Sequence, residues 1–282
     1  MKQSDKYALI TGGSSGLGLS IAKRLASQGY NLVLVSRSEE RLAAARQSIF
    51  DCLKEKAQKA TGTENSACST DIRIFPDIRI FPLDLSDVSA PHRLHDWTTE
   101  QGIRPDILVN DAGMYIYKNL CEIPEGTQNS LIALNINALT SLCRLYGMDM
   151  AQENEGKDAH TRYILNIASY SVYMPIEGFS LYASSKAFVR TFSRCIAKEL
   201  HHKGVKVTAV APAGMDTGLM HLRPGIRKFA RNLGFLANTD TIARISLRAM
   251  KTRGIHYWIP LWFNVLFIPF LWMFQPLFKK VL

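Results

Sequence analysis

The stretch YALITGGSSGLGLSIAKRLASQG, residues 7–29, decides the fold. Its first five residues form the apolar run of a strand, and residues 19–29 carry apolar side chains at the spacing of an amphipathic helix. The turn between them contains Gly12, Gly16 and Gly18. This order brings free N–H groups and the positive end of a helix dipole close to an anion. The stretch therefore predicts a βα unit that binds the pyrophosphate of a dinucleotide.

Short apolar runs alternate with helix-period segments along the rest of the chain. Besides residues 7–11, runs of strand type lie at 32–35, 78–83, 107–110, 163–167, 205–210 and 255–259. Helix-period segments lie at 38–58, 126–150 and 182–201. Strands that alternate with crossover helices form parallel sheets. The sequence therefore predicts an α/β fold, with a single doubly wound Rossmann domain over residues 1–260 and a seven-stranded parallel sheet.

The hexapeptide DIRIFP occurs twice in tandem, at residues 71–76 and 77–82. Either copy has the composition of the strand that leads into LDLSD at 83–87. The second copy adjoins that motif, so we expect it to form the strand and the first copy to be a duplicated loop segment. Repeat architectures need several units of roughly 20–50 residues, so this pair predicts no functional repeat.

The 282-residue chain has 47% hydrophobic and 21% charged residues, a globular composition that excludes disordered, collagen-like and coiled-coil chains. Its five cysteines are scattered, with no CxxC pair and no His at a metal-ligand spacing. This pattern predicts a reducing compartment and no metal site. The amino terminus lacks the apolar run of a secretory signal, so we expect the globular part to be cytoplasmic.

Positive charge is concentrated near the carboxyl terminus. The net charge is +10, and between Leu219 and Leu282 ten Lys and Arg residues stand against one acid, Asp240. Such a surface suits nucleic acid, an anionic membrane or an anionic ligand. No nucleic-acid recognition motif accompanies the charge, so we expect no nucleic-acid partner.

An apolar, aromatic segment follows the last expected strand. Residues 261–278, LWFNVLFIPFLWMFQPLF, contain no charged side chain. Pro269 and Pro276 disfavour a straight helix, and eighteen residues would span about 27 Å, marginal for a bilayer core of about 30 Å. We therefore expect residues 261–282 to form an extension that lies in the interface on the cytoplasmic face of a membrane, beside the basic stretch. The alternative is an apolar cap on the sheet or on a partner subunit.

The end of the second expected strand bears on the choice of cofactor. VSRS at 35–38 has Ser36 and Arg37 where NAD-binding turns carry an acidic residue for the ribose diol. The planar guanidinium of Arg37 suits a 2′-phosphate. We therefore predict NADP(H) as the cofactor; the alternative is a solvated surface arginine.

Seven ordered motifs carry a family resemblance. They are TGGSSGLG at 11–18, LDLSD at 83–87, NDAG at 110–113, LNINAL at 134–139, NIAS at 166–169, YASSK at 182–186 and PAGMDT at 212–217. On these motifs, which span nearly all of the globular part, the chain resembles the short-chain dehydrogenases/reductases. Ser169 precedes Tyr182 by 13 positions, as it does in that family.

Tyr182 and Lys186 are four residues apart, so on a helix they share one face. An ammonium group stabilises a nearby phenolate, so we expect Lys186 to lower the pKa of Tyr182. The resemblance implies that Tyr182 gives a proton to the substrate oxygen, that Lys186 also holds the nicotinamide ribose, and that Ser169 polarises the carbonyl. It aligns Asn135 with an asparagine that holds a water near the lysine, although Asn137 competes for this role. The predicted catalytic set is Asn135, Ser169, Tyr182 and Lys186.

The resemblance also implies a set of cofactor contacts. Asp84 is placed at the adenine and Thr217 at the carboxamide of the nicotinamide. Asp111 stands in place of a common asparagine and Ala213 in place of a common glycine; we expect neither to supply a catalytic side chain. The predicted cofactor-binding residues are Thr11, Gly12, Ser14, Ser15, Gly16, Leu17, Gly18, Ser36, Arg37, Asp84, Leu85, Asn110, Ala112, Gly113, Tyr182, Lys186, Pro212, Gly214 and Thr217.

Together these features predict an NADP(H)-dependent oxidoreductase that interconverts a ketone and a secondary alcohol. A lipid-facing tail favours a hydrophobic substrate, and the chain resembles 3-ketodihydrosphingosine reductases and membrane-bound 3-ketoacyl reductases, with a steroid as a further candidate. The alternatives are a soluble reductase of 3-oxoacyl groups on carrier protein or CoA, and a catalytically silent NADP(H)-binding regulator. By resemblance we expect a homodimer or homotetramer, and an apolar substrate lid between Met215 and Asn238.

Overall fold

The computed structural model describes residues 6–61, 75–155, 160–173, 177–212, 238–251 and 254–258. Its strands form one parallel sheet in the order β3-β2-β1-β4-β5-β6-β7. The expected α/β class with a parallel sheet is confirmed, and β2, β4 and β6 are each two residues longer than expected. The strands are β1 (Tyr7–Thr11), β2 (Asn31–Ser36), β3 (Ile78–Pro82), β4 (Pro105–Asn110), β5 (Arg162–Ile167), β6 (Val205–Pro212) and β7 (Gly254–Trp258).

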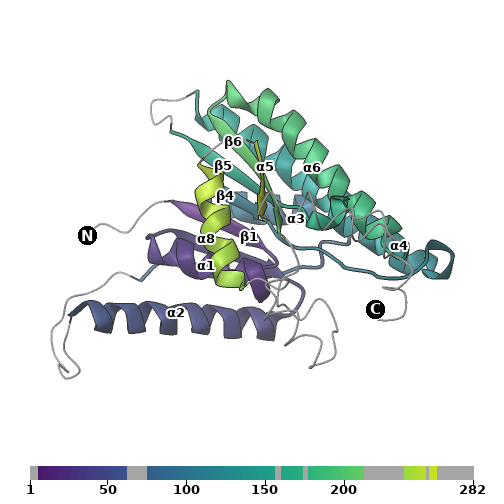
Figure 1. Ribbon diagram of the computed structural model, residues 1–282. Coiled ribbons are helices and arrows are strands. Elements are labelled where there is room, and N and C mark those ends of the chain that lie inside the picture. The colour runs from purple at the N-terminus through teal and green to yellow at the C-terminus, as the bar shows by residue number, and fades with distance from the viewer. Residues whose placement is uncertain are drawn as a thin grey trace.

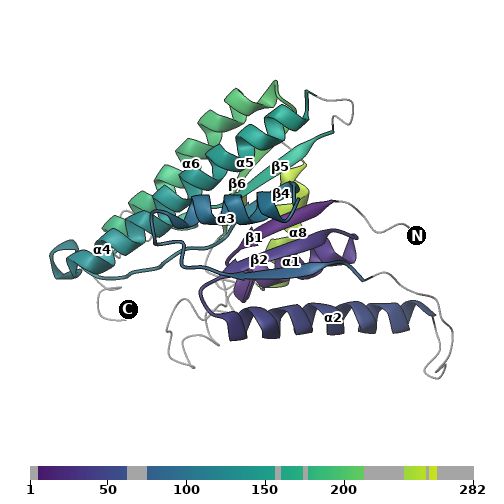
Figure 2. The ribbon, with the colours of Figure 1, turned by 180° about the vertical axis from the view of Figure 1, so that it is seen from behind.

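Helices cover both faces of the sheet, as the two opposite views show (Figures 1 and 2). Because successive strand residues point to opposite faces, Ala8 and Ile10 pack in one apolar core and Leu9 packs in the other. The first core is covered by α1 (Gly16–Ser27), α2 (Glu39–Thr61) and α8 (Thr239–Met250), and the second by α3 (Ala90–Glu100), α5 (Leu139–Glu153) and α6 (Ser180–His201).

The sheet has a topological switch point at β1, which lies between β2 and β4. Open parallel sheets bind ligands outside the carboxyl ends of the strands at such a point, where two loops diverge. The loops that meet here are the glycine turn before α1 and the loop after β4. We therefore expect a ligand site at these two loops and at the ends of the neighbouring strands.

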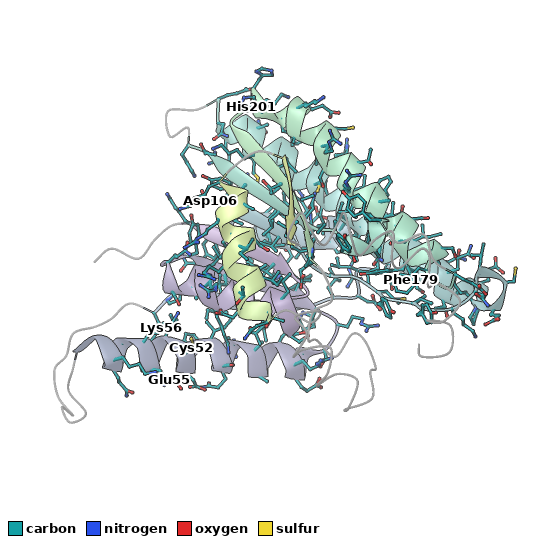
Figure 3. The ribbon with its side chains drawn as sticks, viewed as in Figure 1. Cys52, Glu55, Lys56, Asp106, Phe179 and His201 are labelled. Carbon is teal, nitrogen blue, oxygen red and sulfur yellow. The ribbon has the colours of Figure 1, made fainter. Side chains whose placement is uncertain are left out.

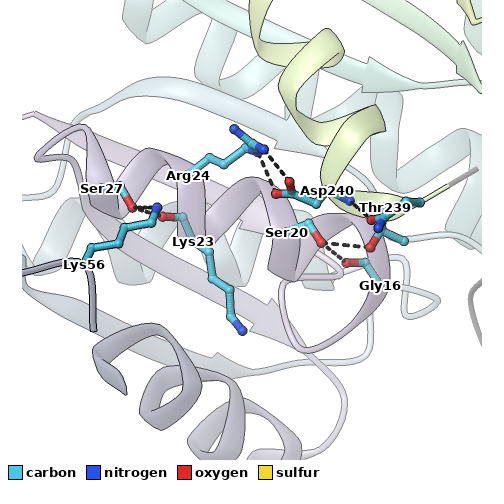
Figure 4. Close-up of polar contacts among 9 residues, drawn as sticks. Gly16, Ser20, Lys23, Arg24, Ser27, Lys56, Thr239 and Asp240 are labelled. Atoms are coloured by element: carbon cyan, nitrogen blue, oxygen red, sulfur yellow. Dashed lines mark hydrogen bonds and ion pairs between the residues drawn. The ribbon is translucent and has the colours of Figure 1, made fainter. Parts of the chain in front are cut away.

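Helix α1 is held in place by the last described helix of the chain (Figure 4). Ser20 Oγ lies 3.1 Å from Thr239 Oγ1, and Arg24 Nε donates to Asp240 Oδ1 at 2.8 Å. At the other end of α1, a lysine of α2 donates to the hydroxyl of the last α1 residue. These contacts fix the position of the α1 amino terminus, which faces the switch point.

The segment expected as one helix over 126–150 contains a π-helical turn. Helix α4 (Glu125–Ile132) is followed by η2, a π-helix over Ala133–Ala138, and then by α5. Inside this turn, the side chain of Asn135 forms two hydrogen bonds with the backbone of Met114. The spacing of apolar residues could not show this contact, because Met114 lies in a separate loop. A π-turn inside an α-helix frequently marks a functional site.

The second copy of the tandem hexapeptide forms β3, as predicted. Ile78 of β3 pairs with Leu32 of β2, and Pro82 is the last residue of the strand. Residues 62–74, which include most of the first copy, lie outside the described ranges.

Two further expectations concern residues that the structure does not describe. These are the apolar extension at 261–282 and most of the lid expected between Met215 and Asn238. Short helices complete the described part, η1 (Leu120–Glu122) after β4 and η3 (Tyr170–Tyr173) after β5. Among the helices of the described ranges, none combines the length and the apolar character needed to cross a bilayer.

A buried polar network joins the elements that surround the switch point. Asn110, the last residue of β4, donates through Nδ2 to Asn166 Oδ1 of β5 at 2.9 Å and to Cys143 Sγ of α5 at 3.3 Å. Asn166 Nδ2 donates to Ser193 Oγ of α6 at 2.9 Å. All four side chains are buried. Because a buried polar group is stable only with a partner, this network fixes how α5 and α6 lie on the sheet.

We expect Asn166→Ala to lower the free energy of unfolding by about 1–3 kcal/mol, because it removes partners of two buried polar side chains. Urea unfolding followed by circular dichroism measures this difference. The control is Asn129→Ala on the exposed face of α4, for which we expect a change below about 0.5 kcal/mol. Equal losses in the two variants would show that the network does not stabilise the fold.

Candidate active site

The glycine turn packs directly against the loop after β4. Gly12 has φ +71°, and a Cβ at this position would lie 3.0 Å from the backbone nitrogen of Ala112. A Cβ on Gly18 would lie 2.5 Å from the carbonyl oxygen of Gly12 and 2.8 Å from Asp111 Oδ2. Only glycine permits these approaches. The predicted positions Gly12 and Gly18 therefore form a cradle of exposed backbone at the amino terminus of α1.

Thr11 joins the two loops that form the cradle. Its buried Oγ1 accepts hydrogen bonds from the N–H groups of Asp111 and Ala112, both at 3.2 Å, and donates to the carbonyl of Val109 at 3.3 Å. One hydroxyl thus satisfies backbone groups of β4 and of the NDAG motif. The predicted cofactor residue Thr11 has a structural role, because it holds the two loops together.

The ends of β2 and β3 offer polar groups on one side of the cradle. Ser36 Oγ is buried and has no hydrogen-bond partner among the described residues, and the neighbouring Arg37 is exposed. Asp84 is also exposed and accepts from the N–H of Ser86 at 2.9 Å, while Leu85 is buried. A free hydroxyl beside an exposed guanidinium suits a phosphate group. Together with the glycine cradle, these residues fit a dinucleotide that carries an additional phosphate.

Predicted catalytic residues meet on the other side of the cradle. Tyr182 and Lys186 lie on one face of α6, and Lys186 Nζ is 6.0 Å from the centroid of the Tyr182 ring. The side chains of Ser169 and Tyr182 are hydrogen-bonded. Lys186 Nζ donates to the carbonyl of Ile167 at 2.9 Å. A Cβ on Gly113 would lie 3.3 Å from Lys186 Nζ. The loop after β4 therefore runs past the lysine without a side chain at Gly113.

Asn135, not Asn137, faces the site. Asn135 is buried and Asn137 is exposed. Asn135 Oδ1 accepts from the N–H of Met114 at 2.8 Å, and its Nδ2 donates to the Met114 carbonyl at 3.0 Å and to Ser185 Oγ at 3.1 Å. The asparagine thus links the loop after β4 to α6 between the two catalytic positions of the YASSK motif. The bond to Ser185 was not anticipated from the sequence.

Burial controls the protonation of Tyr182 and Lys186, the predicted catalytic pair. Burial raises the pKa of Tyr182, and the hydrogen bond to Ser169 opposes this shift. Burial also lowers the pKa of Lys186 to about 8, while the carboxylate of Asp111 acts to raise it. The expected lowering of the Tyr182 pKa by Lys186 is therefore not found. The two groups share a face of α6, but the dominant influence on each is the loss of solvent.

Asp111 has a place in the site that the sequence analysis did not give it. Its carboxylate accepts a hydrogen bond from the N–H of Gly18 and interacts with Lys186. Burial raises the pKa of Asp111 to about 7. The expectation that Asp111 is only a replacement for a common asparagine is incomplete, because the substitution adds a charge beside the catalytic lysine. The feature of the sequence that could have indicated this role is the charged side chain of Asp111 where the family commonly has an asparagine.

An aromatic wall, defined as Tyr115, Tyr117 and Phe179, stands next to the catalytic tyrosine. The ring centroid of Tyr115 lies 5.0 Å from that of Tyr182 and 5.9 Å from that of Phe179, and Tyr117 lies 5.1 Å from Phe179. Phe179 and Asp106, which is near the start of β4, lie on opposite sides of the molecule (Figure 3). The wall is therefore at the carboxyl end of the sheet. It combines residues 115–117 with residue 179, so no local motif indicated it.

The remaining predicted residues divide between described and undescribed parts. Asn110 and Ala112 line a small pocket with Leu85 and Leu134, and Pro212 ends β6. Gly214 and Thr217 lie outside the described residues. Within the described ranges, no three His, Cys, Asp or Glu side chains are grouped so that they could hold a metal ion.

Comparisons with known proteins agree with this geometry. A family model described as short chain dehydrogenase matches residues 6–224. The chain is 32% identical over 222 residues to the very-long-chain 3-oxoacyl-CoA reductase of Rattus norvegicus, a match that covers 77% of this chain and 62% of that relative. It is 27% identical over 253 residues to the 17-beta-hydroxysteroid dehydrogenase type 3 of Danio rerio, with 88% and 70% covered.

A solved structure shows the same arrangement of the chain. The short-chain dehydrogenase from Sphingobium yanoikuyae in complex with NADPH superposes with a TM-score of 0.71 at 25% identity, over 97% of this chain and 95% of that one. The family model itself matches well over half of the sequence. The chain therefore belongs to the short-chain dehydrogenase family and is an oxidoreductase that acts on CH–OH groups.

Proposed function

We propose that the protein uses NADP(H) to interconvert a ketone on a hydrophobic molecule and the corresponding secondary alcohol. The observation that carries the proposal is that the loop after β4, which packs on the glycine cradle through Ala112, also passes Lys186 at Gly113. Tyr182 lies on the same helix as Lys186, and its hydroxyl interacts with Ser169. A proton donor and a dinucleotide site must be adjacent for hydride and proton to reach the two ends of one carbonyl group.

Each side chain of the site has a chemical task in this reaction. NADPH, when bound, supplies the hydride. The hydroxyl of Tyr182 gives its proton to the carbonyl oxygen, and the hydroxyl of Ser169 polarises the same oxygen. In the reaction, the ammonium of Lys186, on the same face of α6, stabilises the negative charge that develops on the phenol. Before the reaction, burial is the dominant influence and the pKa of Tyr182 is raised. Asn135 keeps the loop after β4 against α6, so that these groups stay in register.

We expect Tyr182→Phe to reduce ketone turnover by about 10²- to 10⁴-fold, because it removes the proton donor and keeps the ring. NADPH oxidation by the full chain is the measurement, with 3-oxo-sphinganine, 3-oxoacyl-CoA thioesters, 3-oxoacyl carrier protein, steroid ketones and small ketones as substrates. Binding of NADPH, followed by fluorescence, should be unchanged. Tyr163→Phe on β5 is the matched control and should keep full activity.

The substrate panel separates the alternatives. Turnover of long-chain or steroid ketones supports a lipid substrate, whereas turnover confined to chains on carrier protein would support a soluble 3-oxoacyl reductase. Tight NADPH binding with no turnover that depends on Tyr182 would contradict an enzymatic role and would favour a silent regulator.

The aromatic wall supports a hydrophobic substrate. Tyr115, Tyr117 and Phe179 present ring surface beside the hydroxyl-bearing Tyr182, and apolar ligands bind to such surfaces by burial of area. Two relatives are named for very-long-chain 3-oxoacyl-CoA and for 17-beta-hydroxysteroids, both of which have large apolar bodies. We infer a ketone on a long acyl chain, on a sphingoid base such as 3-ketosphinganine, or on a steroid.

The choice of NADP(H) over NAD(H) rests on the end of β2. Arg37 and the unpartnered hydroxyl of Ser36 offer a cation and a hydrogen-bond donor for the 2′-phosphate. The NADPH complex of the Sphingobium relative supports the same cofactor.

We expect Arg37→Ala to weaken NADPH binding by about tenfold to a hundredfold, which corresponds to about 1.5–3 kcal/mol for a hydrogen bond to a charged group. NADH binding should change little, since NADH lacks the 2′-phosphate. Fluorescence titration with both nucleotides measures the ratio. Arg41→Ala, an exposed arginine of α2, is the control. Equal weakening of NADPH and NADH would contradict the assignment of the 2′-phosphate to Arg37.

We further propose that the chain attaches to an anionic membrane from the cytoplasmic side through residues 261–282 and a basic face on α8. Arg244, Arg248 and Lys251 are exposed and spaced so that they share one side of this helix. Each basic residue near an anionic lipid surface contributes about 1 kcal/mol of binding. The apolar, aromatic sequence at 261–278 follows soon after this helix in the chain.

Flotation of the full chain with vesicles that contain phosphatidylserine tests the membrane proposal. We expect Arg244→Glu/Arg248→Glu to weaken binding by at least about tenfold, because two attractive charges become repulsive. Arg93→Glu/Arg144→Glu reverses two exposed charges of the opposite helix layer and should have a smaller effect. Equal effects of the two double variants would contradict a specific role of α8, and absence of flotation by the unmodified chain would contradict membrane attachment.

We also propose that copies of the chain associate as a homodimer or homotetramer. Met148 of α5 and Phe188 of α6 are exposed apolar side chains, 56% and 37% accessible. By resemblance to the family, we expect subunits to pair through the segments 126–150 and 182–201, which contain these two residues. Sedimentation equilibrium measures the number of subunits.

A further inference from the structure

The amino terminus of α1 is capped by a carboxylate from a distant part of the chain. Ser15 occupies the N-cap position but makes no side-chain cap hydrogen bond, and the first turn of α1 contains no acidic residue. The carboxylate of Asp111, in the loop after β4, instead lies at this turn: a Cβ on Gly18, in the third helical position, would be 2.8 Å from Asp111 Oδ2, and the Gly18 N–H interacts with this carboxylate. A negative charge is stabilised at this end of a helix, where the free N–H groups and the dipole are directed.

The same carboxylate lies beside the catalytic pair. The titratable groups that face Asp111 from the described elements around it are Lys186 and Tyr182, both on α6. The elements β1 and α1 contribute neutral groups, the Thr11 hydroxyl at the Asp111 N–H and the Gly18 N–H at the carboxylate. Among the described residues, the cation that acts on this carboxylate is therefore Lys186, and the carboxylate is buried.

A bound dinucleotide would compete with Asp111 for the end of α1. The pyrophosphate of such a cofactor binds where the N–H groups of this helix end are free. Two negative groups that converge on one site disfavour each other's ionisation, and the carboxyl can relieve the repulsion by taking a proton. The pyrophosphate cannot take up a proton near neutral pH.

We propose that Asp111 takes up a proton from solvent when the dinucleotide binds, so that cofactor affinity decreases as the pH rises. This proposal rests on the proposed cofactor site and adds a residue that controls it. In the free protein the pKa of Asp111 is about 7, raised by burial and lowered by Lys186 and the Gly18 hydrogen bond. The phosphates would raise it further. Below pH 7 the carboxyl is already protonated and affinity is greatest; above pH 7 each binding event must take up a proton.

The size of the effect follows from linkage. For a group that titrates near pH 7 when free and remains protonated in the complex, affinity falls about tenfold between pH 6 and pH 8. Asp111→Asn keeps an oxygen acceptor for the Gly18 N–H and removes the charge. We expect this variant to bind NADPH as tightly as the unmodified chain at pH 6 and about tenfold more tightly at pH 8.

Calorimetric titration of the full chain with NADPH at pH 7.5, in two buffers of different ionisation enthalpy, measures the proton uptake. We expect more than half a proton per cofactor for the unmodified chain and a smaller uptake for Asp111→Asn. The 2′-phosphate of NADPH ionises at a similar pH, but it contributes to both proteins and cancels in their difference. Asp87→Asn, an exposed carboxylate in the loop after β3, is the matched control and should behave as the unmodified chain.

Lys186 also titrates near this range, so a second readout identifies the group. Infrared difference spectra at pH 7.5 should show the C=O band of a protonated carboxyl on NADPH binding, and this band should be absent in Asp111→Asn. NADPH binding without the band, or with the same pH dependence in both proteins, would overturn the inference and leave the proposed function intact. Absence of any dinucleotide binding would overturn both.

Discussion

The close approach of the glycine turn to the loop after β4 is the constraint on which the rest of the site depends. Gly12 and Gly18 leave no room for a Cβ against Ala112, Asp111 and their own turn. The hydroxyl of Thr11 stabilises this contact, because it accepts hydrogen bonds from two N–H groups of the loop. This contact leaves the end of α1 without side chains at Gly12 and Gly18, and it also brings the loop past Lys186. The cofactor cradle and the catalytic pair are therefore two sides of one packing arrangement.

Low solvent access sets the electrostatics of this arrangement. Burial favours the neutral form of every group in it, so the pKa of Tyr182 is raised, that of Lys186 is lowered to about 8 and that of Asp111 is raised to about 7. The charge of Asp111 acts on both of the other groups, since it raises the pKa of Tyr182 and that of Lys186. The simple expectation of a lysine that lowers the pKa of its tyrosine neighbour treats them as an exposed pair, which they are not.

The sequence predicts those parts of the site that depend on local order. Strand, turn and helix follow each other within residues 7–29, and Tyr182 and Lys186 are neighbours on one helix, so periodicity and spacing were sufficient. The π-turn around Asn135, the capping of α1 by Asp111 and the aromatic wall depend on contacts between separate loops. A single sequence does not show which residues of separate loops lie close together in space. In physical terms, local propensity determines the elements, whereas packing between them determines which side chains share an environment.

The contacts that hold α1 against α8 also have a consequence for biosynthesis. Arg24 and Asp240, which join α1 to α8, are 216 positions apart, and Ile21 of α1 shares an apolar core with Ile242. At about 5–20 residues per second, a ribosome needs roughly ten to forty seconds to make the intervening chain. During that time α1 of the nascent protein cannot pack against α8. The cradle for the cofactor can therefore reach its final shape only late in translation.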